Sequence, residues 1–265
     1  MNNKYALITG STAGIGLDIA KELARLGHNI VLTARREDRL KEIAGQLSEE
    51  FNIHCDYVVA DLADNSAPET IFNFCSSHNY AIEILVNNAG YSINKKFHET
   101  GEEEEEKFLR VLGIAVVALT KKFIPAMLDQ KYGRIMMVSS LASFAPPTSG
   151  WGTLYGPVKT FVNRVGDAVN INYRSQGLSS TNVCPGFTVT EFHTASGMQD
   201  EMDKVPNFMK KDSQEVAAGA VKAMMNGKTV WVPGILNKTL AFLCNVLPAN
   251  ILIKMSSSLA GGRYE

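Results

Sequence analysis

The sequence predicts an α/β fold: a doubly wound, seven-stranded parallel sheet with helices on both faces, in one domain that spans residues 1–265. Short apolar runs alternate strictly with longer segments of helical periodicity, and that alternation requires parallel strands joined by crossover helices. Three glycines, Gly10, Gly14 and Gly16, fall between the first strand and the first helix, where folds of this class bind phosphate groups. The length suits one large domain with a sizeable core.

Each element follows from a local pattern. Residues 5–9 form the first strand because this apolar run stops at a glycine, and residues 15–26 form the first helix, with Gly27 as its C-cap. The remaining strands are expected at 30–33, 56–60, 82–86, 134–138, 180–184 and 229–232. The remaining helices are expected at 37–51, 67–77, 103–128, 153–174 and 213–225. This order is that of the Rossmann architecture, whose ligands sit at the carboxyl ends of the strands.

The bulk properties exclude several classes of partner. A net charge of −1 leaves no basic surplus for nucleic acid or an anionic membrane. The cysteines lack CxxC spacing, which favours reduced cytosolic thiols, and the histidines form no pair with metal-ligand spacing, so no metal is expected. The N-terminus leads directly into a strand and no uninterrupted apolar stretch has the length of a membrane span, so we expect no signal peptide and a cytoplasmic protein.

Tyr155 and Lys159 are four residues apart on an expected helix and therefore project from one face. An ammonium beside a phenol favours the phenolate and lowers the tyrosine pKa. A phenol tuned in this way can give a proton to a carbonyl oxygen, or take one from an alcohol, near neutral pH. The spacing alone is a weak signal, but here it follows a serine pair, Ser139 and Ser140, at the end of a strand, and the glycine turn precedes both.

Together these motifs resemble the classical short-chain dehydrogenase/reductase family, and the resemblance covers nearly the whole chain. It includes Asn87-Asn88-Ala89-Gly90 after the fourth strand and Pro185-Gly186 with Thr190 after the sixth. The resemblance implies an oxidoreductase that moves a hydride between a nicotinamide cofactor and a carbonyl or alcohol. It also implies a homodimer or homotetramer, since the expected helices 103–128 and 153–174 are the family's usual dimer surfaces.

The resemblance assigns three catalytic residues. Tyr155 is the general acid that protonates the substrate oxygen, Ser140 hydrogen-bonds that oxygen, and Lys159 binds the nicotinamide ribose and depresses the Tyr155 pKa. Ser140 is preferred to Ser139 because the family's catalytic serine stands just before an x-Ala or x-Gly pair, here Leu141-Ala142.

The cofactor site is expected along the same edge of the sheet. The glycine turn meets three physical needs: a tight turn, close backbone approach to the pyrophosphate, and helix amides that point at it. Its expected binding residues are Gly10, Ser11, Thr12, Gly14, Ile15 and Gly16. Matching family positions add Asp61 and Leu62 beside the adenine, Asn88, Ala89 and Gly90 near the nicotinamide ribose, and Pro185, Gly186, Thr188 and Thr190 at the carboxamide. A solvated loop remains the alternative for the Asp61 and Asn88 segments.

The end of the second strand predicts NADP(H) rather than NAD(H). An acidic residue there would bind the ribose hydroxyls and repel a 2′-phosphate. This chain has Ala34-Arg35-Arg36 instead, and two guanidiniums can hold a phosphate, with Arg35 as the expected main contact. The alternative is that one or both arginines are solvated ends of a charged helix.

Two departures from the family pattern concern catalysis. Where the family has an asparagine in the long helix, which helps to hold a helix irregularity, this chain has Leu112, with no polar group; Gly113 offers another way to deform the backbone. The gap between Ser140 and Tyr155 is longer than is common in the family, and the extra length falls in residues 146–152, expected to wall the substrate pocket. Trp151 is equally well read as a substrate platform or as loop packing.

Three further segments have open interpretations. Glu102 to Glu106 are read as the first turn of the long helix, where carboxylates are favourable, with an acidic docking site as the alternative. Residues 187–211 have the length and position of a substrate lid, and include His193, Met198, Met202 and Phe208, which suit an apolar pocket or simply cover the core. The apolar extension 235–265 covers the active site, packs on a partner subunit, or, least favoured, lies on a membrane.

The sequence therefore predicts an NADP(H)-dependent carbonyl reductase or alcohol dehydrogenase with a lipophilic small-molecule substrate. The first alternative, motivated by Leu112, is a catalytically weak NADP-binding sensor or scaffold of the same fold. The second is a peripheral membrane enzyme that acts on lipid.

Overall fold

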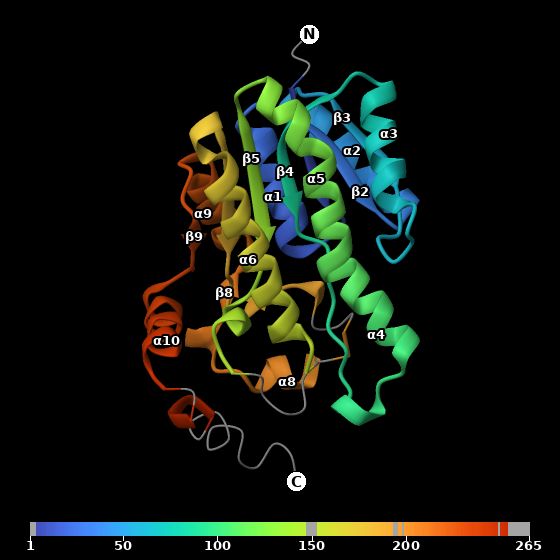
Figure 1. Ribbon diagram of the computed structural model, residues 1–265. Helices are drawn as coiled ribbons and strands as arrows, with labels where there is room; N and C mark the ends of the chain where they lie inside the picture. The colour runs from blue at the N-terminus through green and yellow to red at the C-terminus, as the bar shows by residue number, and fades with distance from the viewer. Residues whose placement is uncertain (1–3, 147–152, 193–195, 198, 249, 254–265) are drawn as a thin grey trace.

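Seven parallel strands form one sheet at the centre of the molecule (Figure 1). The structure is a computed structural model, and it describes residues 4–146, 153–192, 196–197, 199–248 and 250–253. Along the sheet the order is β3-β2-β1-β4-β5-β6-β9. The strands are β1 (Lys4–Thr9), β2 (Asn29–Ala34), β3 (Cys55–Val59), β4 (Ala81–Asn87), β5 (Gly133–Val138), β6 (Leu178–Val183) and β9 (Val230–Trp231). The predicted seven-stranded, doubly wound fold is confirmed.

The strand order reverses between β1 and β4, and this switch point creates the site. β1 pairs with β2 on one side and with β4 on the other, so that Ile8 lies beside both Leu32 and Val86. The chain leaves β1 and β4 in opposite directions, and a crevice opens between the two turns. The turn after β1 carries the glycines, and the turn after β4 carries Asn88 to Gly90.

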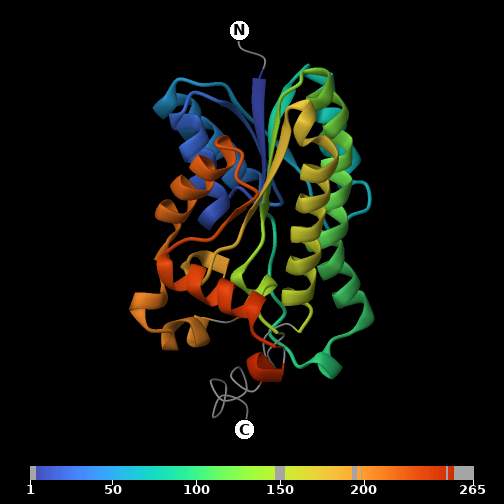
Figure 2. The same cartoon turned by 60° about the vertical axis from the view of Figure 1, so that its left-hand side comes forward.

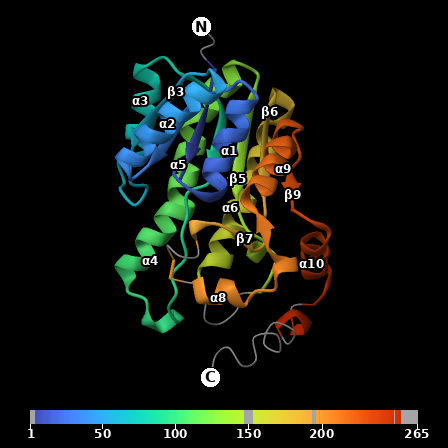
Figure 3. The same cartoon turned by 180° about the vertical axis from the view of Figure 1, so that it is seen from behind.

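Two helical layers cover the sheet, as the edge-on view in Figure 2 shows. One layer holds α3 (Ala67–Ser77), α4 (Glu102–Leu109), α5 (Ala115–Asp129) and α6 (Tyr155–Tyr173). The other holds α1 (Gly14–Arg25), α2 (Glu37–Phe51) and α9 (Ser213–Met225), seen from behind in Figure 3. The predicted helix boundaries in these layers lie within a few residues of the observed ones, apart from the long helix.

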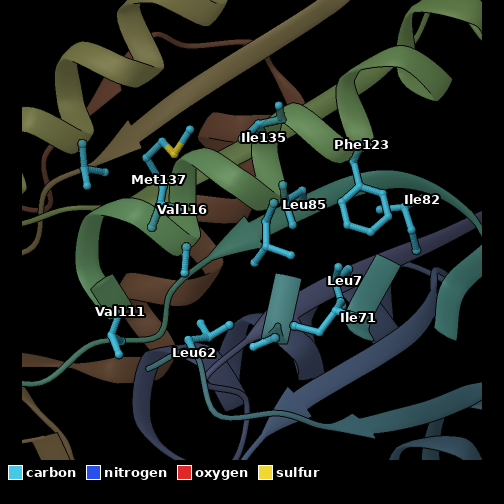
Figure 4. Packing of buried hydrophobic residues seen from close by; sticks show 14 of the residues in the cluster. Leu7, Leu62, Ile71, Ile82, Leu85, Val111, Val116, Phe123, Ile135 and Met137 are labelled. Carbon is cyan, nitrogen blue, oxygen red and sulfur yellow. The ribbon is translucent and has the colours of Figure 1, made fainter. Parts of the chain in front are cut away.

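Successive side chains along each strand point to opposite faces of the sheet, so each strand contributes to the core on both sides. Leu7 packs toward α3 and α5, whereas its neighbour Ile8 packs toward α1 and α9. Figure 4 shows the first of these cores, where Leu7, Leu85 and Ile135 from adjacent strands meet Phe123 of α5. Both interfaces are mostly apolar, as a parallel sheet buried on both faces requires, apart from polar contacts between β6 and α6.

The predicted helix 103–128 is interrupted. α4 begins at Glu102, a five-residue π-helical segment (Arg110–Ile114) follows, and α5 continues from Ala115. The irregularity is therefore present although Leu112 has no polar group. Leu112 is 1% exposed, in a run of three buried residues, Val111 to Gly113, that the wider turn keeps on the inner face.

The acidic run forms the first turn of the long helix, as predicted. Glu102 to Glu105 form the first turn of α4, at the positive end of the helix dipole. Glu103 also pairs with Lys107, and Glu104 pairs with Lys95, which satisfies part of the run locally.

One continuous helical stretch, Glu102–Asp129, is long and apolar enough to cross a membrane by length and composition alone. Over its most apolar window, however, 56% of it is buried inside the domain against the sheet and its neighbouring helices. Its hydropathy is that of a core helix.

The lid and the C-terminal segment lie at the carboxyl end of the sheet. The predicted lid contains β7 (Thr188–Val189), α8 (Gln199–Lys204) and β8 (Lys211–Asp212), and its two strands pair with each other. The C-terminal segment forms α10 (Ile235–Val246), whose buried Ala241 packs with Cys184 and Val232 beside the turn after β5. The inner face of α10 therefore packs behind the site, with Asn237 against Gly186, while Ile235 and Phe242 are exposed. No residue of α10 lines the cavity, so the three interpretations of residues 235–265 stay predictions.

Candidate active site

A cavity of about 1050 Å³ opens at the carboxyl ends of the strands. It reaches from the end of β2 to the first turn of α6, and it is lined by the glycine turn, the turn after β4, the serine turn after β5 and the start of the lid. Every predicted catalytic and cofactor residue lines this cavity except Ser11. Ser11 is fully buried, and its hydroxyl donates to the Thr33 carbonyl, so its side chain supports the turn from behind.

The glycine turn leaves no room for side chains. A Cβ at Gly16 would lie 2.3 Å from Asn88 Nδ2 and 2.4 Å from the Gly10 carbonyl oxygen. Gly10 has a φ of +66°, and a Cβ there would lie 2.8 Å from Ala89 Cα. This cradle at the N-terminus of α1 suits the close approach of a pyrophosphate, so the residues present fit a dinucleotide.

Thr9 and Asn88 join the two turns across the switch point. The Thr9 hydroxyl donates to the Val86 carbonyl and accepts from the amides of Asn88 and Ala89. The Asn88 side-chain amide donates to the carbonyls of Thr9 and Gly10 at 2.9 and 3.0 Å. The Asn88 side chain thus braces the glycine turn, and Thr9 is a supporting residue that sequence reasoning missed. The Thr-Gly pair that begins the motif was its only sequence signal.

Arg35 and Arg36 stand at the far end of the cavity, as predicted. Arg36 Nη2 donates to the Thr12 hydroxyl at 3.0 Å and lies 3.7 Å from the Glu191 carboxylate at the start of the lid. Both arginines are largely exposed. Asp61 and Leu62 line the same end, and Leu62 also packs into the core.

Tyr155, Ser140 and Lys159 converge at the opposite end. Lys159 Nζ lies 5.6 Å from the centre of the Tyr155 ring and donates to the Val138 carbonyl at 2.8 Å. The Ser140 hydroxyl is close enough to the Tyr155 phenol to lower its pKa, whereas the Ser139 hydroxyl donates to the Lys159 carbonyl within the helix. The Ser139 hydroxyl is thus occupied by the helix backbone, and Ser140 is the serine beside the phenol; the catalytic role of Ser140 stays a prediction.

The electrostatics differ from the sequence expectation. Burial raises the pKa of Tyr155 to about 12, and the Ser140 hydroxyl lowers it only in part. Burial also lowers the pKa of Lys159, to about 8. The predicted lowering of the Tyr155 pKa by Lys159 is therefore wrong for this structure, because desolvation dominates and the ammonium is bound to Val138 rather than to the phenol.

The start of the predicted lid lies beside the tyrosine. The Phe192 ring lies 6.0 Å from the Tyr155 ring, centre to centre. Ser196 accepts from the Ser92 amide and the Gly197 carbonyl accepts from Asn94, so residues 196–197 are fastened to the turn after β4. The roles of Phe192 and Ser92 were not predictable from sequence, because they depend on contacts between segments that are distant in the chain.

The pocket wall beyond Tyr155 includes Leu141, Ala142, Ala145 and Pro146. Trp151, His193, Met198 and the residues after 253 lie outside the described residues, so their predicted roles stay open. Met202 is buried, whereas Phe208 of the lid is exposed and does not line the cavity. Among the described residues, no group of histidine, cysteine or carboxylate side chains is arranged to hold a metal ion.

The family model described as short chain dehydrogenase matches residues 4–201. A very-long-chain 3-oxoacyl-CoA reductase of Anas platyrhynchos is 30% identical over 198 residues, which are 72% of this chain and 62% of that protein. The chain thus spans less than two thirds of that relative.

Two further proteins are similar, one in sequence and one in structure. A probable NADP-dependent dehydrogenase of Haemophilus influenzae is 30% identical over 73% of this chain and 77% of its own. The solved structure of a short-chain dehydrogenase from Sphingobium yanoikuyae in complex with NADPH is 25% identical and superposes with a TM-score of 0.81, covering 92% of this chain and 96% of that one. With its sheet order, glycine turn and serine, tyrosine and lysine in one cavity, the chain belongs to the short-chain dehydrogenase family of oxidoreductases.

Proposed function

We propose that the protein is an NADP(H)-dependent oxidoreductase that interconverts a lipophilic ketone or aldehyde and the corresponding alcohol. The observation that carries the proposal is the convergence of Ser140, Tyr155 and Lys159 on one end of a cavity whose other end holds the glycine turn and Arg35 and Arg36. A single cavity can therefore hold a dinucleotide together with a substrate at the tyrosine.

The bound cofactor would supply the hydride. Tyr155 would give its proton to the substrate oxygen, and its raised pKa keeps the phenol protonated and ready to donate at neutral pH. The Ser140 oxygen accepts from the Ala142 amide, so its own proton is available to a second acceptor such as the substrate oxygen. Lys159 is held beside the phenol by Val138 and is expected to contact the nicotinamide ribose.

The choice of NADP(H) rests on charge at the end of β2. Arg35 and Arg36 line the cavity, and the described residues at this strand end, Thr33 to Arg36, include no carboxylate that could bind the ribose hydroxyls instead. The NADPH complex of the Sphingobium enzyme and the name of the Haemophilus relative support the same choice.

The substrate class rests on the wall around the tyrosine. Leu141, Ala142, Ala145, Pro146 and Phe192 give this end of the cavity a mostly apolar surface with small side chains. Such a wall suits an acyl chain or another bulky ketone substituent. The 3-oxoacyl-CoA reductase relative supports placing 3-oxoacyl thioesters among the first compounds to test.

The test is NADPH oxidation by the purified protein across medium- and long-chain 3-oxoacyl thioesters, bulky ketones, aldehydes and vicinal diketones, with NADH in parallel. We expect turnover with at least one lipophilic carbonyl and a preference for NADPH. Tyr155→Phe should abolish it, while Tyr173→Phe, at the other end of the same helix, should not. NADPH binding without turnover on any carbonyl would instead favour a nucleotide-binding module.

A further inference from the structure

The backbone around Ser140 is fixed by a short chain of hydrogen bonds. Ser140 precedes a 3-10 turn, Leu141–Ser143, and its side chain caps that turn by accepting from the Ala142 amide at 3.1 Å. The Ser140 carbonyl accepts twice from Ser143, from the amide at 3.1 Å and from the hydroxyl at 2.6 Å. Ser143 thus uses its only hydroxyl proton to hold the backbone of Ser140.

Asn163 completes this arrangement from the catalytic helix. It lies one turn after Lys159 on α6, and its side-chain amide donates to the Ser143 hydroxyl at 2.7 Å. The nearby Thr160 hydroxyl donates to the Ser143 carbonyl at 2.9 Å. The turn with Ser140 is therefore tied to the helix that carries Tyr155 and Lys159.

Asn163 is itself held on its other side. Its carbonyl accepts from the Asn182 side chain of β6 at 3.0 Å, and its side-chain oxygen faces the Cys184 thiol at 3.8 Å. Asn163 is 8% exposed and Ser143 is 9% exposed, so water does not compete strongly for these bonds. Neither side chain has a part in the chemistry proposed above.

We propose that Asn163 and Ser143 are positioning residues for catalysis. The chain from Asn163 Nδ2 through the Ser143 hydroxyl to the Ser140 carbonyl sets the Ser140 hydroxyl relative to the Tyr155 phenol. The chain starts at Asn163 on α6, and Thr160 of the same helix holds the Ser143 carbonyl, so the serine and the tyrosine keep one relative position even though they come from separate segments. This proposal rests on the proposed function in that it takes Ser140 as the serine that contacts the substrate oxygen.

Asn163→Leu and Ser143→Ala break the chain at its two links. We expect each to lower kcat about ten- to a hundredfold, the size of effect that a misplacement of about 1 Å causes, with little change in NADPH affinity. Ser143→Thr keeps the hydroxyl and should retain most of the rate. The pH dependence of kcat should also shift, since the Ser140 hydroxyl lowers the pKa of the Tyr155 phenol.

Asn170→Leu is the matched control. Asn170 is also on α6 and also 8% exposed, but its side chain bonds Ser180 of β6, away from the cavity lining. It should lose stability like Asn163→Leu and keep its kcat at temperatures where it is folded. Equal kcat values in the Asn163 and Asn170 variants would overturn the proposal.

A second measurement does not need turnover. The amides of Leu141, Ala142 and Ser143 are hydrogen-bonded in the turn, to Pro185, Ser140 Oγ and Ser140 O. Their hydrogen exchange should speed up in Asn163→Leu and Ser143→Ala, but not in Asn170→Leu. If the wild-type protein reduces no carbonyl, the proposed function fails, but these exchange rates still test whether Asn163 and Ser143 hold the turn. Unchanged protection of the three amides in both variants would refute the positioning proposal.

Discussion

At the scale of single residues, Arg36 lies between a neutral and an anionic partner. Its guanidinium donates to the Thr12 hydroxyl, which holds it at the rim of the glycine turn, and it faces the Glu191 carboxylate at 3.7 Å. Both members of this ion pair are more than half exposed, so the pair itself is weak. A phosphate that binds Arg36 must share the guanidinium with Glu191.

Replacing Arg36 and replacing Glu191 should change NADPH affinity in opposite directions. Arg36→Ala should weaken NADPH binding about tenfold, because a charge-assisted bond to phosphate is lost, and leave NADH binding unchanged. Glu191→Gln should tighten NADPH binding about two- to fivefold by removing the competing carboxylate. Calorimetric titration with both nucleotides measures this, with Glu50→Gln on α2 as a control. Equal losses for NADH and NADPH in Arg36→Ala would contradict a phosphate contact.

The residues of the site divide into those that sequence could identify and those it could not. Gly10, Gly16, Ser140, Tyr155 and Lys159 were predictable because their motifs are local and each has a chemical reason. Thr9, Ser143 and Asn163 were not, because their roles come from bonds between turns and helices that meet only in the folded chain. The Tyr155 pKa was misjudged for a related reason: spacing shows that a lysine is near, but not how deeply both groups are buried.

At the scale of elements, the π-helical segment Arg110–Ile114 is the main departure from the predicted pattern. Helical periodicity predicted one regular helix, since apolar residues recur through both halves. The extra residue in the turn brings Leu112 against Gly90, where a Cβ at Gly90 would lie 3.6 Å from Leu112 Cγ and 3.7 Å from Lys159 Nζ. Leu112 is therefore part of the apolar surroundings of the lysine.

Leu112→Asn should destabilise the protein. The asparagine amide would be buried in a cluster of apolar side chains, and the loss of packing together with an unpaired polar group should cost about 2–4 kcal/mol. Urea unfolding of the two proteins measures the change, and Leu109→Asn, at a position one turn earlier that is 40% exposed, is the control. An unchanged midpoint in Leu112→Asn would show that the segment offers partners for a polar group.

The strands were predicted more closely than the lid. Residues 134–138 were identified because a parallel strand buried on both faces is a compact apolar run. Residues 180–184 are mostly polar, and were placed by the alternation of strands and helices. In the lid, β7 and β8 are only two residues each, and they exist because they pair with each other across 22 residues of chain. No local pattern marks pairing of that kind.

At the scale of the whole molecule, the fold buries Lys159, and the free energy of unfolding should depend on pH as a result. Burial lowers the pKa of Lys159 from 10.5 to about 8, so between these values the unfolded chain binds more protons than the folded chain. The free energy of unfolding therefore rises with pH in this range. The stability gained from a neutral Lys159 is fully present above pH 10.5 and is lost as the pH falls through about 8.

Lys159→Met removes that titration. Relative to the variant, wild type should gain up to about 3 kcal/mol between pH 8 and 10.5, from about 1.4 kcal/mol for each unit of pKa. Urea unfolding at several pH values measures the difference. Lys21→Met, on the exposed side of α1, should give a curve parallel to wild type, because solvent reaches that side chain in both states. A wild-type curve parallel to Lys159→Met would mean that Lys159 is not desolvated.

The claim that most needs testing is that Tyr155 transfers a proton to a carbonyl while NADPH is consumed. The direct measurement is a single turnover, with enzyme in excess over NADPH and the best carbonyl from the panel, followed by the loss of NADPH absorbance. The account predicts fast decay in wild type and, in Tyr155→Phe, bound NADPH that does not decay. Equal decay rates in the two proteins would contradict the role of Tyr155, and no decay in wild type would contradict the proposed reductase.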